Sequence, residues 1–415
     1  MSQPETNVVI LGAGPAGATT SIFLAKHKID HIILDKATFP RDKICGDAMS
    51  GKVISVLKSI DPAFVFELDK DDTHYAGCWG VQFIAPNGQP LDVPFRGKPE
   101  EQEHAPGFIS KRMDFDNFLV NKIDEKYATK WLGCDVKDVI DHQDHFEIIY
   151  KQNGEEKSST CRMVIGAEGD RSIVAKKLAG HKMNPKYYAA GLRAYYENVT
   201  GMHPQKFIEL HYIKEILPGY LWVFPLPGNQ ANVGIGLLSE KVRSHKLRLR
   251  DMMETALKTN ANLKERFKNA RVVDDAKGWG LPLGSIKRDL SGRGYLLTGD
   301  AGSLIDPFTG EGIGNAMVSG RYAAETIAEA IKANDYSADF LKMYDQKVYD
   351  RLWKELKLSY TIQRLLKYPW LFNFVANRAT KNKTIQETMM FMFDDINIRS
   401  KLKSPSFYFK MLFNS

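Results

Sequence analysis

The 415-residue sequence predicts a mixed α/β (α+β) protein with a Rossmann-type domain that begins with a βαβ unit, an antiparallel β-sheet domain and a helical C-terminal part. Three patterns carry this prediction. A short β-branched run leads into spaced glycines and then a helical pattern, which is the start of a βαβ unit. Two inserts are rich in strand-like stretches, and apolar residues recur at helical spacing from Tyr336 onward. The length favours two or three domains with an ample core.

The composition is that of a globular protein with one basic region. Apolar residues make up 43% of the chain and charged residues 26%, which excludes collagen-like, mucin-like and wholly disordered chains. The net charge of +7 arises in residues 336–415, which hold 14 basic and 7 acidic side chains, while the rest sum to zero. This local excess predicts a surface that meets anions.

The four cysteines indicate reduced thiols. Cys45, Cys78, Cys134 and Cys161 show no Cys-x-x-Cys spacing, and His and Cys do not cluster as a zinc site requires, so we expect no metal. No basic leader precedes the first apolar run, and no run approaches the ~20 residues that span a bilayer. We therefore expect a cytoplasmic protein.

The first sixty residues contain the βαβ unit. Residues 8–11 form a β-branched run, residues 12–17 read Gly-Ala-Gly-Pro-Ala-Gly, and a helical pattern follows over 18–26. A second strand, 31–34, ends at Asp35. This order of elements, a strand, a glycine turn, a helix, a second strand and an acidic residue, predicts a dinucleotide-binding site. The alternative is an ordinary glycine turn in another α/β fold.

Each of these residues has a physical role in that site. Gly12 permits the tight turn, Gly14 lets backbone N–H groups approach a pyrophosphate, and Gly17 lets the helix sit close to the strand. The helix N-terminus faces the phosphate, and Asp35 can accept hydrogen bonds from ribose hydroxyls. The contacts expected from this unit are Gly12, Gly14, Pro15, Ala16, Gly17, Asp35 and Lys36.

The loop after the second strand points to a flavoprotein. Residues 39–48 read Phe-Pro-Arg-Asp-Lys-Ile-Cys-Gly-Asp-Ala. This arginine, lysine and Cys-Gly pair resembles the geranylgeranyl reductase family, in which the loop passes under the flavin ring. The resemblance implies that Arg41, Cys45, Gly46 and Asp47 lie at the cofactor. The Cys45 thiol would be redox-active there, or it would only pack against the ring or open a tight turn with Gly46.

Two further segments resemble related flavoproteins. Residues 112–119 look like an Arg-x-x-Phe-Asp-x-x-Leu helix start, whose arginine points at the FAD phosphate and ribityl region; the alternative for Arg112 is a surface helix. Val136, in a strand-like stretch from Trp131 to Ile140, falls where relatives present backbone to the adenine. In the Gly-Ala-Glu-Gly segment Glu168 replaces the usual Asp, so no specific contact carries over.

The strongest late pattern runs from Leu296 to Ala316. A strand ends at Gly299-Asp300, where Asp300 can accept hydrogen bonds from ribityl hydroxyls. The glycines that follow leave backbone N–H groups accessible at the start of a helix. These N–H groups can stabilise the negative charge of reduced flavin. The expected contacts are Gly299, Asp300, Gly310, Gly312 and Ile313, with Gly314 completing the glycine run. The whole resembles a glutathione-reductase-type FAD fold of the hydroxylase branch, and Gly-Asp-Ala-Gly-Ser favours its reductases over aromatic hydroxylases.

These segments predict a discontinuous domain organisation. We expect an FAD-binding domain from 1–74, 111–186 and 287–335, a β-rich substrate domain from 75–110 and 187–286, and a basic, aromatic helical region at 336–415.

The substrate domain contains a distinctive aromatic strand. Alternation places Tyr220, Trp222 and Phe224 on one strand face, and the Tyr-x-Trp-x-Phe-Pro pattern again resembles geranylgeranyl reductases, whose aromatic face lines the pocket opposite the flavin. The face is either such a pocket wall or plain sheet core. No Trp-x-Trp-x-Ile-Pro segment of flavin halogenases occurs.

The family resemblance implies an FAD-dependent oxidoreductase that reduces C=C bonds of a polyprenyl or similar lipid by hydride transfer. Catalytic candidates are Cys45, Tyr220 and Trp222, and the proton donor is Tyr220, Cys45 or ordered water. The alternatives are a flavin monooxygenase on a hydrophobic substrate and a flavin-binding protein without turnover. The expected electron donor is NAD(P)H, bound transiently, or ferredoxin.

The C-terminal region predicts contact with a membrane surface. Apolar and basic residues interleave from Tyr336, and a Met- and Phe-rich stretch begins at Met389. Such a tail can lie on the inner face of an anionic bilayer, or its helices can cover the substrate cavity. No basic-aromatic motif of a nucleic-acid-binding fold accompanies it.

Overall fold

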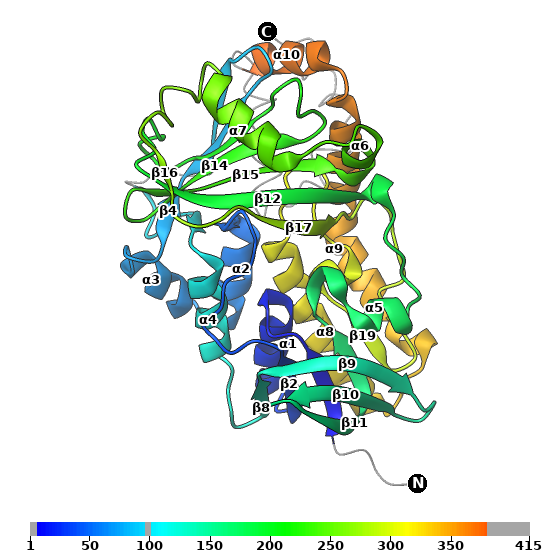
Figure 1. Cartoon of the computed structure of the whole chain (residues 1–415). Coiled ribbons are helices and arrows are strands. Elements are labelled where there is room, and N and C mark those ends of the chain that lie inside the picture. Colours follow the sequence, from blue (N-terminus) through cyan, green and yellow to red (C-terminus); the bar gives the residue numbers. More distant parts are fainter. Residues whose placement is uncertain (1–5, 96–100, 380–415) are drawn as a thin grey trace. The chain divides into compact units, whose positions relative to one another are not determined.

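The computed structural model describes residues 6–95 and 101–379 (Figure 1). The chain forms two compact units. The first contains the described residues up to Lys43, Arg112–Tyr187 and Leu281–Lys357, and the second contains those from Ile44 to Lys111, Tyr188–Gly280 and those from Leu358 on. The predicted mixed α/β fold is confirmed.

The first unit holds the βαβ start of the chain. Its strands are β1 (Thr6–Leu11), β2 (His31–Asp35), β8 (Ala128–Leu132), β9 (Cys134–Asp141), β10 (Phe146–Gln152), β11 (Glu155–Gly166), β18 (Ser291–Gly292) and β19 (Tyr295–Leu297). Its helices are α1 (Pro15–Lys26), α4 (Arg112–Asn121), α5 (Ile173–Lys177), α8 (Ile313–Ala333) and α9 (Ala338–Leu365), of which α9 continues into the second unit.

The sheet of this unit has the order β18-β19-β11-β1-β2-β8. β1 pairs in parallel with β2 and β11, so that Val9 lies between Ile32 and Val164. All three side chains come from apolar, β-branched runs, which suit a strand that is covered on both faces. β9 and β10 extend β11 as an antiparallel ribbon.

Helices α1 and α8 pack closely in this unit (Figure 1). A Cβ on Gly320 of α8 would lie 2.5 Å from the Ala16 carbonyl oxygen of α1. The N-terminal half of α1 is made of small, buried residues, which let the two helix backbones approach. The two glycine-rich segments of the sequence therefore belong to one packed layer.

The second unit holds the aromatic strand. Its strands are β3 (Ala48–Met49), β4 (Ala76–Cys78), β5 (Gly80–Ile84), β6 (Pro90–Pro94), β7 (Gly107–Ile109), β12 (Tyr188–Glu197), β13 (Ile208–His211), β14 (Tyr220–Leu226), β15 (Gln230–Leu238), β16 (Arg271–Val272) and β17 (Lys277–Pro282). Its helices are α2 (Gly51–Ile60), α3 (Ala63–Lys70), α6 (Ser239–Ser244), α7 (Leu249–Thr259) and α10 (Pro369–Ala379).

Its large sheet has the order β16-β12-β15-β14-β13-β5-β6, and β17 also pairs with β12. In this sheet β12 with β15, β15 with β14, β14 with β13 and β5 with β6 pair antiparallel, and β13 pairs with β5 in parallel. Helix α7 covers one sheet face, where Leu221, Val223 and Val233 join Met253 and Leu257 in a buried core. A small sheet, β3-β7-β4, lies in the same unit.

The two units divide the chain differently from our expected boundaries, and the described part of the 336–415 region is split between them. Residues 44–74, which we expected in the FAD-binding domain, belong to the second unit, where β3 pairs with β7. The first part of α9 belongs to the first unit: Tyr344 and Val348 are fully buried, and Tyr344 donates its hydroxyl to the Leu297 carbonyl at 2.8 Å. Within the described ranges, no helix is long and apolar enough to cross a membrane.

Candidate active site

The glycine turn after β1 is too tight for any side chain at two positions. Gly12 has a φ of +98°, and a Cβ there would lie 2.4 Å from the Ala167 carbonyl oxygen. A Cβ on Gly17 would lie 1.8 Å from the Gly12 carbonyl oxygen. Gly14 is the N-cap of α1, Pro15 and Ala16 are buried in its first turn, and no described side chain caps this helix end. Its first N–H groups therefore suit an anion.

Asp35 secures this turn from the end of β2. Its carboxylate accepts the Ala13 N–H at 2.7 Å and the Ala37 N–H at 2.9 Å. Each oxygen keeps a second lone pair, which leaves room for the predicted ribose contact. The neighbouring Lys36 is exposed.

A buried carboxylate holds the two predicted arginines. Asp116 has no exposed surface. It accepts hydrogen bonds from Arg112 Nε at 2.7 Å and Nη2 at 2.8 Å, and from Arg41 Nη1 at 2.6 Å. Arg41 Nη2 lies 3.7 Å from the position of a Cβ on Gly14, beside the start of α1. Arg41 is thus the arginine at the glycine turn, whereas two of the three Arg112 nitrogens are bound to Asp116.

Asp300 interacts with the positive charge of Arg112, one of the two arginines described above, and with that of Lys43. It follows β19 in a short 3₁₀ turn, Gly299–Gly302, in which Gly299 has a φ of +56° and donates its N–H to Ser319 Oγ at 2.9 Å. Burial raises the pKa of Asp300, and the positive charges of Lys43 and Arg112 act in the opposite direction. A partly buried carboxyl group of this kind can accept hydrogen bonds from hydroxyl groups of a ligand.

One of the backbone N–H groups at the start of α8 is already hydrogen-bonded to a side chain of the protein. Gly312 is the N-cap, Ile313 is buried, and Gly310 has a φ of +72°. The Gly314 N–H, which we expected to be free for the flavin, donates to Glu311 Oε1 at 2.6 Å. The glycine run therefore builds a turn with a negative charge at its helix end, and fewer N–H groups than expected remain for a ligand.

Two other predicted segments have local partners. Glu168 accepts from Ser172 Oγ at 2.6 Å and from the Ile173 N–H at 3.0 Å, so it caps α5, and burial raises its pKa. Val136 is half-buried in β9 and pairs with Tyr150 of β10. The stretch that we predicted as one strand is interrupted at Gly133, whose φ is +74°.

In the second unit, the aromatic stripe of β14 lies on the sheet face opposite α7. Tyr220, Trp222 and Phe224 follow each other with ring centroids 6.2 Å apart. Trp222 pairs with Gly234 of β15, and a Cβ on Gly234 would lie 2.1 Å from the indole. The predicted common face is confirmed, and it is separate from the core under α7.

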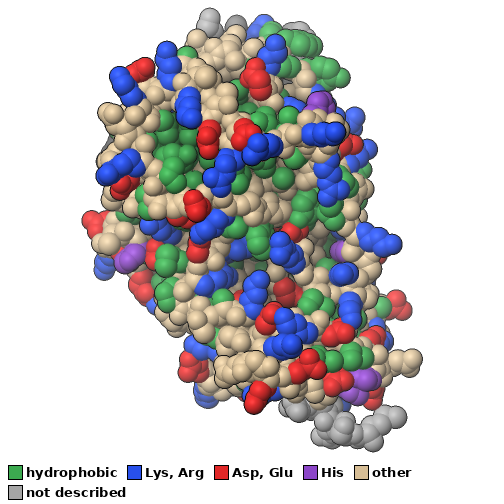
Figure 2. Space-filling view, in the orientation of Figure 1, with side chains coloured by type: hydrophobic (Ala, Val, Ile, Leu, Met, Phe, Trp, Pro, Cys, Tyr) green, Lys and Arg blue, Asp and Glu red, His purple; other side chains and the backbone are tan. Residues whose placement is uncertain are grey.

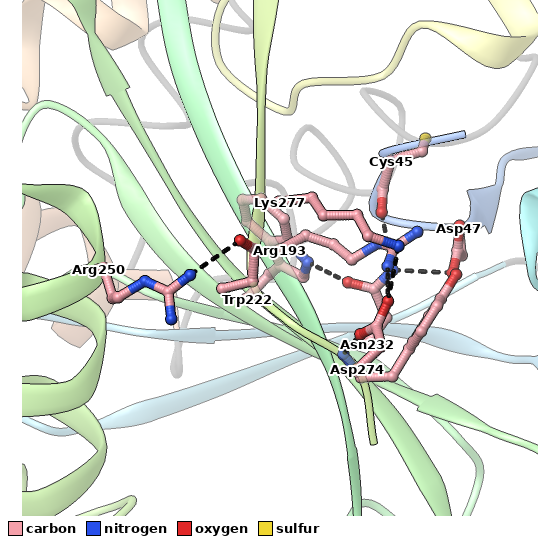
Figure 3. A network of polar contacts seen from close by, with 10 residues as sticks. Cys45, Asp47, Arg193, Trp222, Asn232, Arg250, Asp274 and Lys277 are labelled. Atoms are coloured by element: carbon pink, nitrogen blue, oxygen red, sulfur yellow. Dashed lines mark hydrogen bonds and ion pairs between the residues drawn. The ribbon is translucent and has the colours of Figure 1, made fainter. Parts of the chain in front are cut away.

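Asn232 links this stripe to the Cys-Gly-Asp segment (Figure 3). Its Oδ1 accepts the Trp222 indole N–H at 2.8 Å, and its Nδ2 donates to the Cys45 carbonyl at 2.7 Å and to Asp47 Oδ2 at 2.8 Å. Both Asn232 and Asp47 are fully buried. Gly46 fits because a Cβ there would lie 2.8 Å from the Phe224 ring.

The network continues along β12. The Tyr195 hydroxyl donates to Asp47 Oδ2 at 2.7 Å, and its N–H donates to Asp274 Oδ1 at 3.1 Å. The buried Arg193 guanidinium lies 3.9 Å over the Tyr195 ring and binds Asp274 Oδ2 at 3.1 Å, where Lys277 also donates (Figure 3). A buried cation thus has a carboxylate partner.

The structure brings together most of the predicted residues in two groups. In the first unit the glycine turn, Arg41, Arg112 and Asp300 are neighbours, and in the second Cys45, Gly46, Asp47 and Trp222 share one network. Sequence reasoning missed the hydrogen-bonding partners within each group, which are Asp116 in the first unit and Asn232, Tyr195 and Arg193 in the second. Asp116 is the aspartate of the Arg-x-x-Phe-Asp pattern, so the sequence could have indicated that it pairs with an arginine.

The first unit fits an FAD molecule. A diphosphate can bind at the glycine turn, where no side chain fits, beside the uncapped start of α1 and Arg41. Asp35 and Asp300 can accept hydrogen bonds from hydroxyl groups of the cofactor.

Comparison with known proteins agrees with this fit. Residues 5–359 match the FAD binding domain family. The chain is 30% identical over 366 residues to the digeranylgeranylglycerophospholipid reductase of Methanocaldococcus jannaschii, covering 86% of this chain and 85% of that one. It is 26% identical over 373 residues to the menaquinone reductase of Mycobacterium tuberculosis (strain CDC 1551 / Oshkosh), covering 88% and 85%.

Solved structures share the fold. A geranylgeranyl bacteriochlorophyll reductase-like protein of Thermoplasma acidophilum superposes with a TM-score of 0.79 at 23% identity over 91% of each chain. A flavin-dependent brominase superposes with a TM-score of 0.78 at 21% identity, covering 94% of this chain and 93% of that one. From its motifs, its cofactor cradle and these matches, the chain belongs to the FAD binding domain family and is an FAD-dependent oxidoreductase of the geranylgeranyl reductase type.

Proposed function

We propose that the enzyme reduces carbon–carbon double bonds in the isoprenoid chain of a lipid. The observation that carries the proposal is the aromatic stripe of Tyr220, Trp222 and Phe224, which stands on the sheet face away from the α7 core. Relatives named for a digeranylgeranyl lipid and for menaquinone support an isoprenoid substrate.

In this proposal the first unit holds the cofactor. The glycine turn and Arg41 would bind the diphosphate, Asp35 the ribose, and Asp300 the ribityl hydroxyls. Val136 would present its backbone to the adenine. When bound, FAD supplies in its reduced form the hydride that adds to one alkene carbon.

The second unit would hold the substrate and the proton source. Apolar contact with the aromatic stripe would retain an isoprenoid chain and exclude water from it. The second alkene carbon needs a proton, for which Tyr220 Oη, Cys45 Sγ and ordered water are our candidates. Both side chains are half-buried, and the Cys45 backbone is fixed through its carbonyl by Asn232. We take NAD(P)H or ferredoxin as the electron donor.

The proposal includes peripheral contact with a membrane through the C-terminal region, because an isoprenoid lipid resides in a bilayer. The Met- and Phe-rich stretch from Met389, which we expected to contribute, lies outside the described residues.

The test is anaerobic reduction of the purified holoenzyme, followed by mixing with a geranylgeranyl lipid in detergent. We expect flavin reoxidation without oxygen and products heavier by two hydrogens for each bond reduced. Trp222→Leu should slow this reaction, whereas Trp353→Leu, at a half-buried tryptophan in α9, should not. A flavin that stays reduced until air enters and then yields an oxygenated lipid would establish the monooxygenase alternative, and no reaction in either condition would favour a binding protein without turnover.

A further inference from the structure

We propose that the end of α9, the turn after it and α10 form a docking surface for an anionic phospholipid bilayer. We call it the interfacial surface. The inference rests on the proposed membrane contact and names the residues that make it. The surface consists of Leu365, Tyr368, Trp370 and Phe374, with Arg364, Lys367 and Arg378 between them.

The apolar side chains of this surface are unusually exposed. The exposed fractions are 45% for Leu365, 55% for Tyr368, 68% for Trp370 and 49% for Phe374. Eight large hydrophobic side chains are exposed in the described part of the chain, and these four lie within ten consecutive residues. The others are scattered over both units. A concentration of this kind marks an interaction site, whereas single exposed apolar residues do not.

Helix α10 makes polar contacts with its unit, and Trp370 and Phe374 are exposed. Asn373 Oδ1 accepts the Asn87 N–H at 3.2 Å, and Asn377 Oδ1 accepts from Asn87 Nδ2 at 3.5 Å. Leu366, just before the helix, is 2% exposed. Trp370, Phe374 and Arg378 follow at a spacing of four, so they form a separate stripe along α10.

The charge around this stripe selects the partner. Among the described residues, the stretch 356–379 contains four basic side chains and no acidic one. Arg378 lies with its guanidinium 5.3 Å over the Phe374 ring, which puts a cation at the edge of the apolar stripe. Trp and Tyr prefer the membrane–water interface, and Lys and Arg are attracted to anionic headgroups.

A second copy of the chain fits this surface less well. In a two-fold symmetric contact the same surface meets itself, so the cations of one copy would face those of the other. An anionic bilayer supplies both the apolar phase for the rings and the counter-charge for Arg364, Lys367 and Arg378. In Figure 2, hydrophobic side chains with Lys and Arg beside them occupy the part of the view where Figure 1 places α10.

The test is co-sedimentation of the oxidised holoenzyme with vesicles of equal parts phosphatidylcholine and phosphatidylglycerol. Each cation near an anionic surface contributes about 1 kcal/mol, or about fivefold in binding, so Arg364→Gln, Lys367→Gln and Arg378→Gln together should weaken it on the order of 100-fold. Three exposed lysines elsewhere, Lys246→Gln, Lys264→Gln and Lys268→Gln, are the matched control, and this variant should keep most of the binding.

A second pair of variants tests the apolar side chains. Trp370→Ser with Phe374→Ser should abolish binding, whereas Val272→Ser with Val273→Ser, which removes exposed apolar side chains elsewhere, should not. Equal loss in both pairs, or equal binding of the wild type to pure phosphatidylcholine, would overturn the assignment. So would a dimer that the Trp370 and Phe374 substitutions dissociate. Because no substrate is used, a failure here is distinguishable from a failure of alkene reduction, which is measured in detergent.

Discussion

Replacing Asp116 by Asn tests how the cofactor site is held together. Asp116 is fully buried and accepts three hydrogen bonds from two guanidinium groups, at 2.6, 2.7 and 2.8 Å. The amide keeps the shape of the carboxylate but removes its charge and sets an N–H group against a guanidinium donor. Breaking a buried ion pair costs about 3–5 kcal/mol, so we expect the free energy of unfolding to fall by that amount.

The same substitution should weaken FAD binding. It frees Arg41 and Arg112, and ordering each freed side chain again on binding costs about 0.5–1.5 kcal/mol, or about 5- to 150-fold in the dissociation constant for both. The assay is titration of the apoprotein with FAD, followed by the quenching of flavin fluorescence. Asp138→Asn is the matched control, because its ion pair with Lys177 is part-exposed and should contribute at most about 1 kcal/mol.

One result would refute this reasoning. If Asp116→Asn binds FAD as tightly as the wild type, or more tightly because a negative charge is gone, then Asp116 stabilises the fold without positioning the arginines. Should the variant not fold, Arg41→Lys tests the same point, because it leaves the Arg112–Asp116 pair intact and removes only the forked donor beside Gly14.

Three further predictions concern other parts of the molecule. Gly17→Ala should lower the FAD content of the purified protein and its melting temperature, because the new Cβ would lie 1.8 Å from the Gly12 carbonyl oxygen; the flavin-to-protein absorbance ratio measures this. Burial alone would raise the pKa of Glu209, but hydrogen bonding to its neighbours, Arg266 among them, holds it below its usual value. The stability that this carboxylate contributes is therefore fully present above the unfolded-state pKa of about 4.3 and is lost as the pH falls through the lower folded-state pKa, so the urea midpoints of wild type and Glu209→Gln should differ at neutral pH and converge only below about pH 4.3. Asn232→Leu leaves at least two buried polar groups unpaired and should lower the free energy of unfolding by about 2–6 kcal/mol, with slower isoprenoid reduction, and an unchanged urea midpoint would contradict the network.

The local parts of the fold could be predicted because their patterns are short and periodic. The runs at β1 and β2, the alternation of β14 and the glycine spacing each specify one element without reference to distant residues. The ends of the elements are harder to predict. Helix α1 begins at Pro15, before the helical pattern at Ala18, because small residues with no periodicity are buried against α8.

The missing parts of the site are contacts between distant segments. Asp116 meets Arg41 across 75 residues, and Asn232 meets the Cys45 carbonyl across 187. A polar residue in an apolar strand, such as Asn232 between Val233 and Ala231, carries no sign of its partner. The boundary of the compact units depends on such distant contacts too: residues 44–74 follow the glycine turn in sequence but belong to the unit that contains β14.

The most direct measurement of the central claim is the stoichiometry of a single anaerobic turnover. Holoenzyme with fully reduced flavin is mixed with a geranylgeranyl lipid in detergent, and flavin absorbance and lipid mass are followed in the same samples. The account predicts one double bond lost, and two hydrogens gained, for each flavin reoxidised. Flavin reoxidation without hydrogenated lipid, or hydrogenation that requires oxygen, would contradict it.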